Sequence, residues 1–361
     1  MEPGIALQGK VTAPTESAVT APAMREERSK RRLSQEGIVF VLAVVLACGF
    51  AIILGDGFYR VDNIIALVRS VSVLGMLGLG MALVVIGRGI DLAMIATMVV
   101  AVSWALNLAQ GGHDFYYALL LGAIFVILVG LTTGFLVAYA EVPAIFTTLA
   151  MGSVIFGVGR LFFFQLDSQN TPTGYDWFDF IGHGSIFTLP TINGNGVAIP
   201  TPIVLFALVA VLLFLALKFT IFGRYVYASG DNPLASRTAG IPTRVLTMAE
   251  YTVSSAVAYC AGIVMASAAN GINTRIYNST MIYDVLLIVV LGGIGLSGGR
   301  GGIRNVIVGT ILVGVLLNGM TIMNVPYTVQ NLVKSVTLLT ALFIESAVNP
   351  RDEQTSQQGD I

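Results

Sequence analysis

The sequence predicts an all-α integral membrane protein with about ten transmembrane helices, a number set by the length of chain that each span needs. Three observations support this class. Hydrophobic residues make up 55% of the 361 residues and charged residues only 11%, and the mean hydropathy is +0.84, so charges are too few to cover a water-soluble surface. Apolar runs of membrane-spanning length recur along the chain. Lys and Arg are also concentrated in alternate loops.

The two ends of the chain are predicted to be polar tails. Residues 1–35 are rich in Ala, Pro, Thr, Ser and Glu, lack apolar periodicity and end in a charged run, which predicts a disordered tail. This segment is not a secretory signal, because the apolar run after it is as long as a full span and no small-residue cleavage pattern follows. We expect residues 36–349 to form the transmembrane domain and residues 350–361 a second tail.

The transmembrane domain contains ten apolar runs. They lie near residues 38–55, 62–86, 90–109, 116–139, 144–164, 202–222, 246–268, 284–297, 303–319 and 327–348. The eighth run is short, so it is either a half-helix or a span that begins nearer Tyr277.

The distribution of basic residues predicts the orientation, because Lys and Arg near span ends are retained in the cytoplasm. With the N-terminus inside, 14 of the 19 Lys and Arg residues lie on the inner side and five on the outer side. Both termini are therefore predicted to be cytoplasmic. The outer loop 165–201 carries Asp167, Asp176 and Asp179 but no Lys or Arg. It either caps a vestibule or receives a soluble partner, or it is an ordinary extracytoplasmic loop with interfacial aromatic residues.

Two motifs superficially suggest an enzyme, and their context rejects both. Gly293, Gly295 and Gly298 match G-x-G-x-x-G, but an apolar segment follows, with no acidic residue before Glu345 to hold a ribose. The string around Ser297 resembles the serine motif of rhomboid-type proteases, yet both histidines lie in predicted outer loops, out of reach of this inner serine. We expect no catalytic or metal site. The net charge of −1 also provides no basic field for nucleic acid.

The string Gly89–Ala93 recurs as residues 293–297, which hints at the internal duplication that transporter folds often have. Ionisable residues within the spans are sparse, and no Asp, Glu or His relay at mid-depth indicates proton coupling. Polar residues are candidates for a translocation pathway for a neutral, hydroxyl-rich solute: Ser72, Asp91, Asn107, Thr148, Asn270 and Asn318. Alternatively, such side chains bond their own or a neighbouring helix.

The most distinctive polar segment is the inner loop 223–241. A turn is predicted at Gly230, Asp231 and Asn232, followed by a short helix with Asp231 or Asn232 as its N-cap and Pro233 at its first position. Gly240 is predicted to end this helix. A short helix of this kind is suited to docking on a soluble partner, although it could equally be a connection between spans.

At this segment the sequence resembles a known family. Gly223-Arg224, Ala228, Gly230, Asn232, Ala235 and Gly240-Ile241 resemble the cytoplasmic loop of ribose-type permease subunits of ATP-binding cassette (ABC) importers. Three further blocks agree in order: residues 89–92, residues 142–144 with 148–151, and residues 289–293 with 298–299. Two departures exist. Ala93-Met94-Ile95 replaces the usual Ser-Val-Gly, so substrate preference does not carry over, and Ser236 replaces the second residue of an Ala-Ala pair.

The resemblance implies a permease that translocates a monosaccharide or polyol across the bacterial inner membrane. Its implied partners are two ABC ATPase subunits, a periplasmic sugar-binding protein and a second permease copy or paralogue. The implied ATPase-coupling loop comprises Gly230, Asp231, Asn232, Ala235, Gly240 and Ile241. ATP is expected to bind the partner and no cofactor this chain, which lacks the P-loop pattern. A stand-alone secondary active transporter is the alternative.

Overall fold

The protein is described here by a computed structural model, which describes residues 35–189 and 197–348. These residues all belong to one unit of the chain, residues 34–361. The predicted tails lie almost entirely outside the described residues, so their structure and their side of the membrane stay predictions. Helices occupy all ten positions at which the sequence predicts a span.

The described helices, in chain order, are α1 (Gln35–Leu54), α2 (Asp56–Tyr59), α3 (Val61–Ile86), α4 (Met94–Gln110), α5 (Phe115–Ala138), α6 (Ala144–Val158), α7 (Asp176–His183), α8 (Thr201–Phe219), α9 (Ile221–Asp231), α10 (Pro233–Thr238), α11 (Thr243–Ala268), α12 (Met281–Leu291), α13 (Ile303–Ile322) and α14 (Tyr327–Val348). A π-helix, η1 (Gly159–Phe163), extends α6, and a 3₁₀-helix, η2 (Thr274–Asn278), precedes α12.

Among the described helices, seven are long and apolar enough to cross a membrane: α1, α3, α5, α6 with η1, α8, α11 and α13. The multi-pass class is therefore confirmed, whereas the count of ten is not. Apolar α4 and α12 have only 17 and 11 residues. They are short because the backbone leaves the helical conformation in the adjoining segments 87–93 and 292–302.

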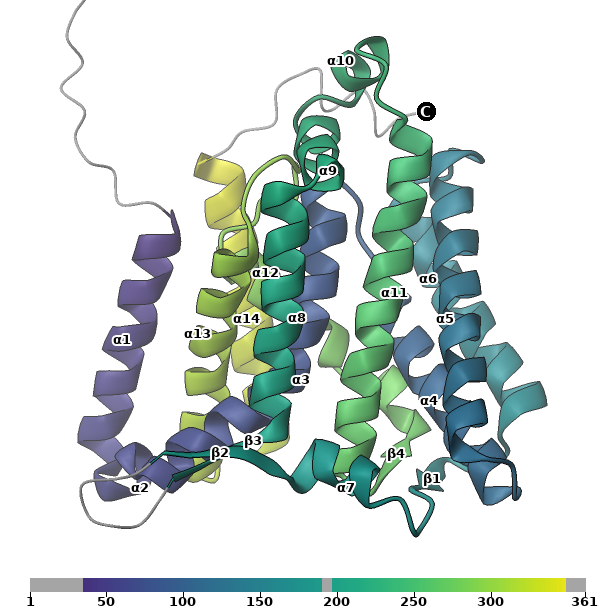
Figure 1. Cartoon of the computed structure of the whole chain (residues 1–361). Coiled ribbons are helices and arrows are strands. Elements are labelled where there is room, and N and C mark those ends of the chain that lie inside the picture. The colour runs from purple at the N-terminus through teal and green to yellow at the C-terminus, as the bar shows by residue number, and fades with distance from the viewer. Residues whose placement is uncertain (1–34, 190–196, 349–361) are drawn as a thin grey trace, which may run out of the picture. The chain divides into compact units, whose positions relative to one another are not determined.

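The short elements separate into two ends of the helix bundle (Figure 1). Helices α9 and α10 lie at one end, here called the inner end, and α7 with the short strands lies at the other, here called the outer end. Among the described residues, Arg224 of α9 and Arg237 of α10 lie at the inner end, and the sequence analysis assigned both to the cytoplasmic side.

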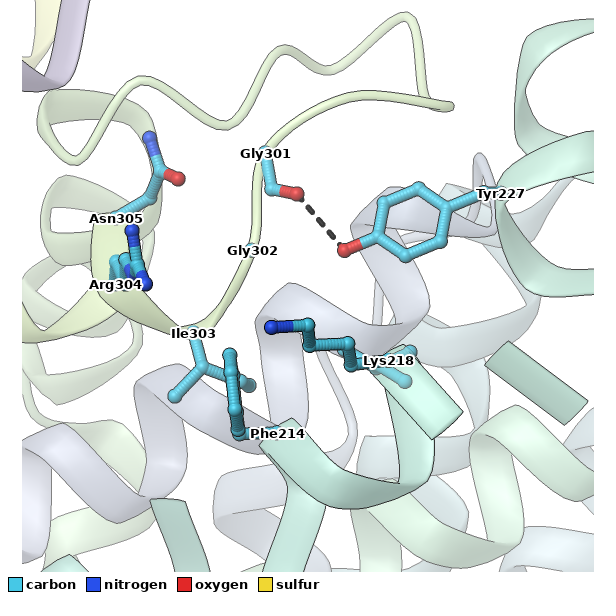
Figure 2. Close-up of a pocket in the computed structure, with 9 residues that line it drawn as sticks. Phe214, Lys218, Tyr227, Gly301, Gly302, Ile303, Arg304 and Asn305 are labelled. Carbon is cyan, nitrogen blue, oxygen red and sulfur yellow. Dashed lines mark hydrogen bonds between the residues drawn. The ribbon is translucent and has the colours of Figure 1, made fainter. Parts of the chain in front are cut away.

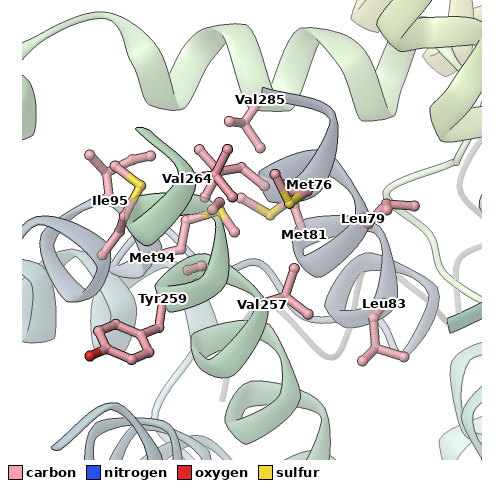
Figure 3. Close-up of a cluster of buried hydrophobic side chains, with 14 of the residues drawn as sticks. Met76, Leu79, Met81, Leu83, Met94, Ile95, Val257, Tyr259, Val264 and Val285 are labelled. Atoms are coloured by element: carbon pink, nitrogen blue, oxygen red, sulfur yellow. The ribbon is translucent and has the colours of Figure 1, made fainter. Parts of the chain in front are cut away.

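The core is centred on α3 and α11, which pack along each other. Helix α11 also packs along α4 and α5, and α3 packs along α8, α12 and α13. Figure 3 shows Met76 and Met81 of α3, Met94 of α4 and Val257 of α11 meeting in one buried cluster. Helices α1 and α8, by contrast, expose most of their apolar side chains. This distribution suits a lipid solvent, in which apolar surface carries no penalty and helices satisfy their own backbone groups.

Helices α5 and α11 approach closely because α5 presents glycines to α11. A Cβ atom at Gly130 would lie 2.5 Å from the Cα atom of Thr252, and one at Gly134 would lie 2.6 Å from that of Met248. Small residues of this kind let helix backbones pack directly where no hydrophobic effect drives helices together. This contact anchors α11 at the centre of the bundle.

The predicted acidic outer loop contains secondary structure. Strand β1 (Ser168–Asn170) pairs antiparallel with β4 (Gly271–Asn273), and β2 (Ser185–Leu189) pairs antiparallel with β3 (Val197–Pro200). Helix α7 packs against the outer end of α11, where a Cβ atom at Gly182 would lie 2.3 Å from the amide nitrogen of Ala268. The aromatic rings of Tyr175, Trp177 and Phe178 surround Phe115 of α5. The loop is therefore packed on the bundle.

Helices α3 and α12 end in the same kind of cap, but α4 and α13 end in it too, so the predicted internal duplication stays a prediction. The Gly89 amide donates to the Val84 carbonyl at 2.8 Å, and the Ile294 amide donates to the Val289 carbonyl at 3.1 Å. The preceding residues, Arg88 and Gly293, have φ angles of 74° and 86°, as in a Schellman C-cap. In these caps Gly89 corresponds to Ile294. The repeated string in the sequence aligned Gly89 with Gly293, so the two alignments differ by one residue.

Candidate functional site

The predicted inner loop is more helical than expected. Helix α9 begins where the Thr220 hydroxyl accepts a hydrogen bond from the Gly223 amide at 3.3 Å, and it continues through Asp231. Gly230 and Asp231 therefore lie in the last turn of a helix, and the prediction of a turn at these residues was wrong. The sequence analysis missed this helix because Gly230 is a poor helix former.

Helix α10 matches its prediction closely. The Asn232 side chain caps it by accepting a hydrogen bond from the Ala235 amide at 2.9 Å, and Pro233 occupies its first position. Gly240 follows the last turn with a φ of 82°, and the Ile241 amide closes the cap on the Ser236 carbonyl at 3.0 Å. Both ends of this six-residue helix are capped, so its local conformation is well determined.

Gly230 is the centre of a backbone junction at the inner end. A Cβ atom at this position would lie 1.9 Å from the Ile86 carbonyl oxygen and 2.5 Å from the Gly299 nitrogen. The Gly299 amide itself donates to the Ile86 carbonyl at 2.8 Å. The last turn of α9, the last turn of α3 and the segment 292–302 thus meet with no side chain between them; we call this contact the inner junction.

Tyr227 of α9 reinforces the inner junction. Its hydroxyl donates to the Gly301 carbonyl at 2.9 Å (Figure 2). Burial raises the pKa of this hydroxyl above its ordinary value, so Tyr227 remains a neutral donor at physiological pH.

Helix α11 holds segment 87–93 through side chains that the sequence analysis did not select. The Ser254 hydroxyl donates to the Asp91 carboxyl group at 2.8 Å, and the Tyr251 hydroxyl donates to the Ile90 carbonyl at 3.2 Å. The carboxyl group of Glu250 packs against Gly87, where a Cβ atom would lie 2.2 Å from Oε2. In the sequence, the signal for this contact was Glu250, an acidic residue within the apolar run that forms α11.

A cavity of about 690 Å³ opens at the outer end. Its lining residues come from α3, α11, α12 and the end of β3, and they include Asp62, Arg69, Ser70 and Asp284. Arg69 donates to the Gly182 carbonyl of α7 at 2.7 Å, so α7 is tied to the cavity wall. The cavity offers both acceptors and donors at an apolar surface, which is the usual composition of a small-molecule site.

A buried ion pair lies beside this cavity. The Lys334 ammonium nitrogen of α14 is 2.8 Å and 2.9 Å from the two carboxylate oxygens of Asp284. Thr280 and Tyr327 surround the pair with hydroxyl groups, which share a hydrogen bond of 3.1 Å. Fifty residues separate Asp284 from Lys334, so nothing in the local sequence indicated that they pair.

The six candidate pathway residues are not brought together, and none lines the outer cavity. Ser72 and Thr148 bond carbonyl groups of their own helices, as the alternative reading expected. The remaining four have separate surroundings. Asn107 donates to the Phe163 carbonyl, and Asn318 exchanges hydrogen bonds with Asn63. Asn270 lies in an exposed turn, and Asp91 accepts a hydrogen bond from Ser254. Their role in a pathway stays a prediction.

A multi-pass helical bundle with a mainly apolar cavity that carries a few polar groups at one end, and a capped, exposed helix at the other, is suited to membrane transport. The chain belongs to the family described as branched-chain amino acid transport system / permease component, which matches residues 63–342. The predicted resemblance to ribose-type permease subunits of ABC importers is confirmed by curated relatives of that kind.

Three relatives illustrate the similarity. Ribose import permease protein RbsC of Escherichia coli (strain K12) is 27% identical over 319 residues, which cover 85% of this chain and 92% of the relative. RbsC of Bacillus subtilis (strain 168) is 28% identical, with 85% and 90% covered. Galactofuranose transporter permease protein YtfT of Escherichia coli (strain K12) is 29% identical, with 86% of each chain covered. No solved structure matches the chain significantly.

Proposed function

We propose that this chain is the membrane-spanning permease subunit of an ABC importer that translocates a monosaccharide or polyol across the bacterial inner membrane. The observation that carries the proposal is similarity along 79–86% of the chain to permeases named for ribose, galactofuranose and fructose. The family description names branched-chain amino acids, but the sugar permeases among its relatives favour a polyhydroxy solute. The chain itself acts as a transport subunit rather than an enzyme.

The outer cavity supports a polyhydroxy solute on chemical grounds. Asp62 and Asp284 supply acceptors and Arg69 supplies donors, at a wall that is otherwise mainly apolar. The Ser70 hydroxyl donates to the Leu67 carbonyl, so its oxygen adds a further acceptor. A sugar hydroxyl both donates and accepts hydrogen bonds, so one solute can use both sets of groups. In this proposal a periplasmic binding protein delivers the solute to the outer end, and α7 borders its entrance.

The inner end supports coupling to ATPase subunits. The proposed coupling loop contains Gly230, Asp231, Asn232, Ala235, Gly240 and Ile241, and the Leu234 side chain of α10 is 67% exposed. A displacement of α10 would reach α3 directly, because the inner junction joins α9 to the last turn of α3 without flexible side chains between them. Segment 87–93 and Asp91 follow that turn. The loop thus provides a mechanical route from a cytoplasmic partner into the bundle.

Co-purification tests this proposal. The tagged chain is purified from its host in mild detergent, alongside a variant with residues 233–238 scrambled and a control with residues 185–189 of the outer end scrambled. Scrambling 233–238 leaves Gly230 and the inner junction unchanged. We expect an ATPase subunit with the intact chain and with the control but not with the first variant. A chain that purifies alone in every case would favour a stand-alone secondary transporter instead.

Replacement of Gly240 by Val tests the coupling loop separately. A Cβ atom there would contact nothing within 4 Å, but the φ of 82° is unfavourable for other residues, at a cost of about 1–2 kcal/mol. We expect insertion into the membrane to persist and solute uptake to be lost, because α10 is displaced locally. Uptake is measured with radiolabelled solute in cells, and normal uptake by a fully inserted variant would contradict the role given to this loop.

A further inference from the structure

The cavity shown in Figure 2 belongs to neither the outer solute site nor the coupling loop. It has a volume of about 270 Å³ and lies at the inner end between α8, α9 and the start of α13. Its walls are formed by Phe214, Leu217, Lys218, Tyr227 and residues 301–305. It lies where the spans α8 and α13 reach the inner boundary of the bundle.

The charge of this cavity is unbalanced. Lys218 and Arg304 line it, and none of its lining residues is acidic. Within residues 35–189 and 197–348, neither cation forms an ion pair. The neutral polar groups are already occupied, because Tyr227 donates to Gly301 and the Asn305 side chain donates to the Gly292 carbonyl at 2.7 Å. Two positive charges therefore face the cavity without a counter-ion.

The position of Lys218 is determined by aromatic rings. Its ammonium nitrogen is 5.2 Å from the ring centroid of Phe214 and 5.3 Å from that of Phe219, within the range of a cation–π contact. Figure 2 shows the side chain extending toward Ile303, at the start of α13 beside Arg304. The cation is thus directed across the cavity, toward the helix that carries the second one.

An apolar surface continues from the cavity toward the centre of the bundle. On α8, Val211 and Leu215 are 52% and 45% exposed and lie one turn below Phe214 and Lys218. On α13, Ile311 is 42% exposed and lies two turns below Arg304. Residues spaced by three, four or seven positions share one helix face, so the cationic cavity is continued by exposed apolar side chains on two helices that are long and apolar enough to cross a membrane.

We propose that this cavity binds the phosphate of an anionic phospholipid of the inner leaflet. Lys218 and Arg304 contact the phosphate oxygens, and Val211, Leu215 and Ile311 contact the acyl chains. A free phosphate ion shares the first contact but not the second. Basic pockets between spans on the cytoplasmic side are suited to such headgroups, and the planar guanidinium of Arg304 matches phosphate geometry. Because Gly301 borders both features, the bound lipid stabilises the inner junction.

The test uses the full chain, purified in detergent and stripped of lipid. Native mass spectrometry and thermal unfolding are followed during titration with phosphatidylglycerol, phosphatidylcholine or inorganic phosphate. We expect phosphatidylglycerol to bind most tightly and to raise the unfolding temperature. In the double variant Lys218→Gln/Arg304→Gln its affinity should fall by about tenfold or more, because each cation near a lipid surface contributes about 1 kcal/mol.

The matched control is Arg224→Gln/Arg300→Gln, which removes the same charge from the same end but outside the cavity. It should bind phosphatidylglycerol as the unmodified chain does. An equal loss in the control, equal affinity for the two lipids, or equal stabilisation by inorganic phosphate would each overturn the proposal. If the double variant does not fold, the preference of the unmodified chain for phosphatidylglycerol over phosphatidylcholine still decides the outcome. The variant Lys218→Arg keeps the charge and should retain that preference.

Discussion

The two ends of the bundle are stabilised by different groups. At the inner end, α3, α9 and segment 292–302 meet through backbone atoms, and Gly230 leaves no room for a side chain. At the outer end, charged and aromatic side chains add to the backbone contacts of α7 and the strands, with Asp167 and the Asp284–Lys334 pair as examples. Backbone contacts transmit a displacement rigidly, whereas side-chain contacts can be exchanged for a solute. The difference matches a transporter that is driven from inside and loaded from outside.

The largest effect is expected for Gly230→Val at the inner junction. The added atoms would overlap the Ile86 carbonyl and the Gly299 amide, and backbone on both sides cannot move aside. Overpacking commonly costs about 1–3 kcal/mol, but because backbone lies on both sides here we expect a loss beyond this range and beyond the cost of a broken buried ion pair, which is about 3–5 kcal/mol. It should be seen as little monodisperse protein in size-exclusion chromatography. Gly157→Ala, a helical site with nothing within 4 Å of the added atom, is the control and should behave as the unmodified chain.

The second largest effect is expected at the outer end, from Lys334→Met. This change leaves the Asp284 carboxylate without its ammonium partner in a buried site, and breaking a buried pair from one side typically costs about 3–5 kcal/mol. Thermal unfolding in detergent measures the loss. The double variant Lys334→Met/Asp284→Leu should recover much of it, because no uncompensated charge remains. Additive losses in the double variant would show that the two charges do not stabilise each other.

A smaller effect is expected from Ser254→Ala, which removes the hydrogen bond to the Asp91 carboxyl group. A hydrogen bond to a charged group contributes about 1.5–3 kcal/mol, and we expect a lower unfolding temperature together with slower solute uptake. Thr252→Val is the matched control on the same helix, because its hydroxyl bonds only the Met248 carbonyl of its own helix. Equal effects of the two changes would indicate that segment 87–93 does not depend on α11.

The smallest effect is expected from Asp167→Asn, on the exposed outer surface. A hydrogen bond from Arg275, together with the charge of Arg160, lowers the pKa of this carboxyl group. Its stabilising contribution is therefore present above the unfolded pKa of about 3.9 and is lost as pH falls through the lower folded value. The unfolding temperatures of the two chains should differ slightly at pH 7 and converge at acid pH. A difference that persists unchanged in acid would rule out the ion pairs as its source.

The features that the sequence predicted correctly depend on a few neighbouring residues. The positions of the helices follow from the length of apolar runs, and α10 follows from Asn232, Pro233 and Gly240, whose capping and turn preferences act within one helical turn. The segregation of basic residues to one end also follows from the loops themselves. These signals were sufficient for the membrane class and for the resemblance to a permease.

Long-range packing decided the contacts between residues that are far apart in the sequence. Asp284 meets Lys334 fifty residues away, and β1 meets β4 about a hundred residues away. The selected polar residues Ser72 and Thr148 proved to be satisfied by their own helices, whereas Ser254 reached Asp91 from another helix. Local sequence thus determined where the apolar helices and α10 form, since these energies arise within a few residues. The side of the membrane that each end faces stays a prediction. Only the tertiary structure decided which charges pair and where backbones touch, because those contacts depend on how the helices pack.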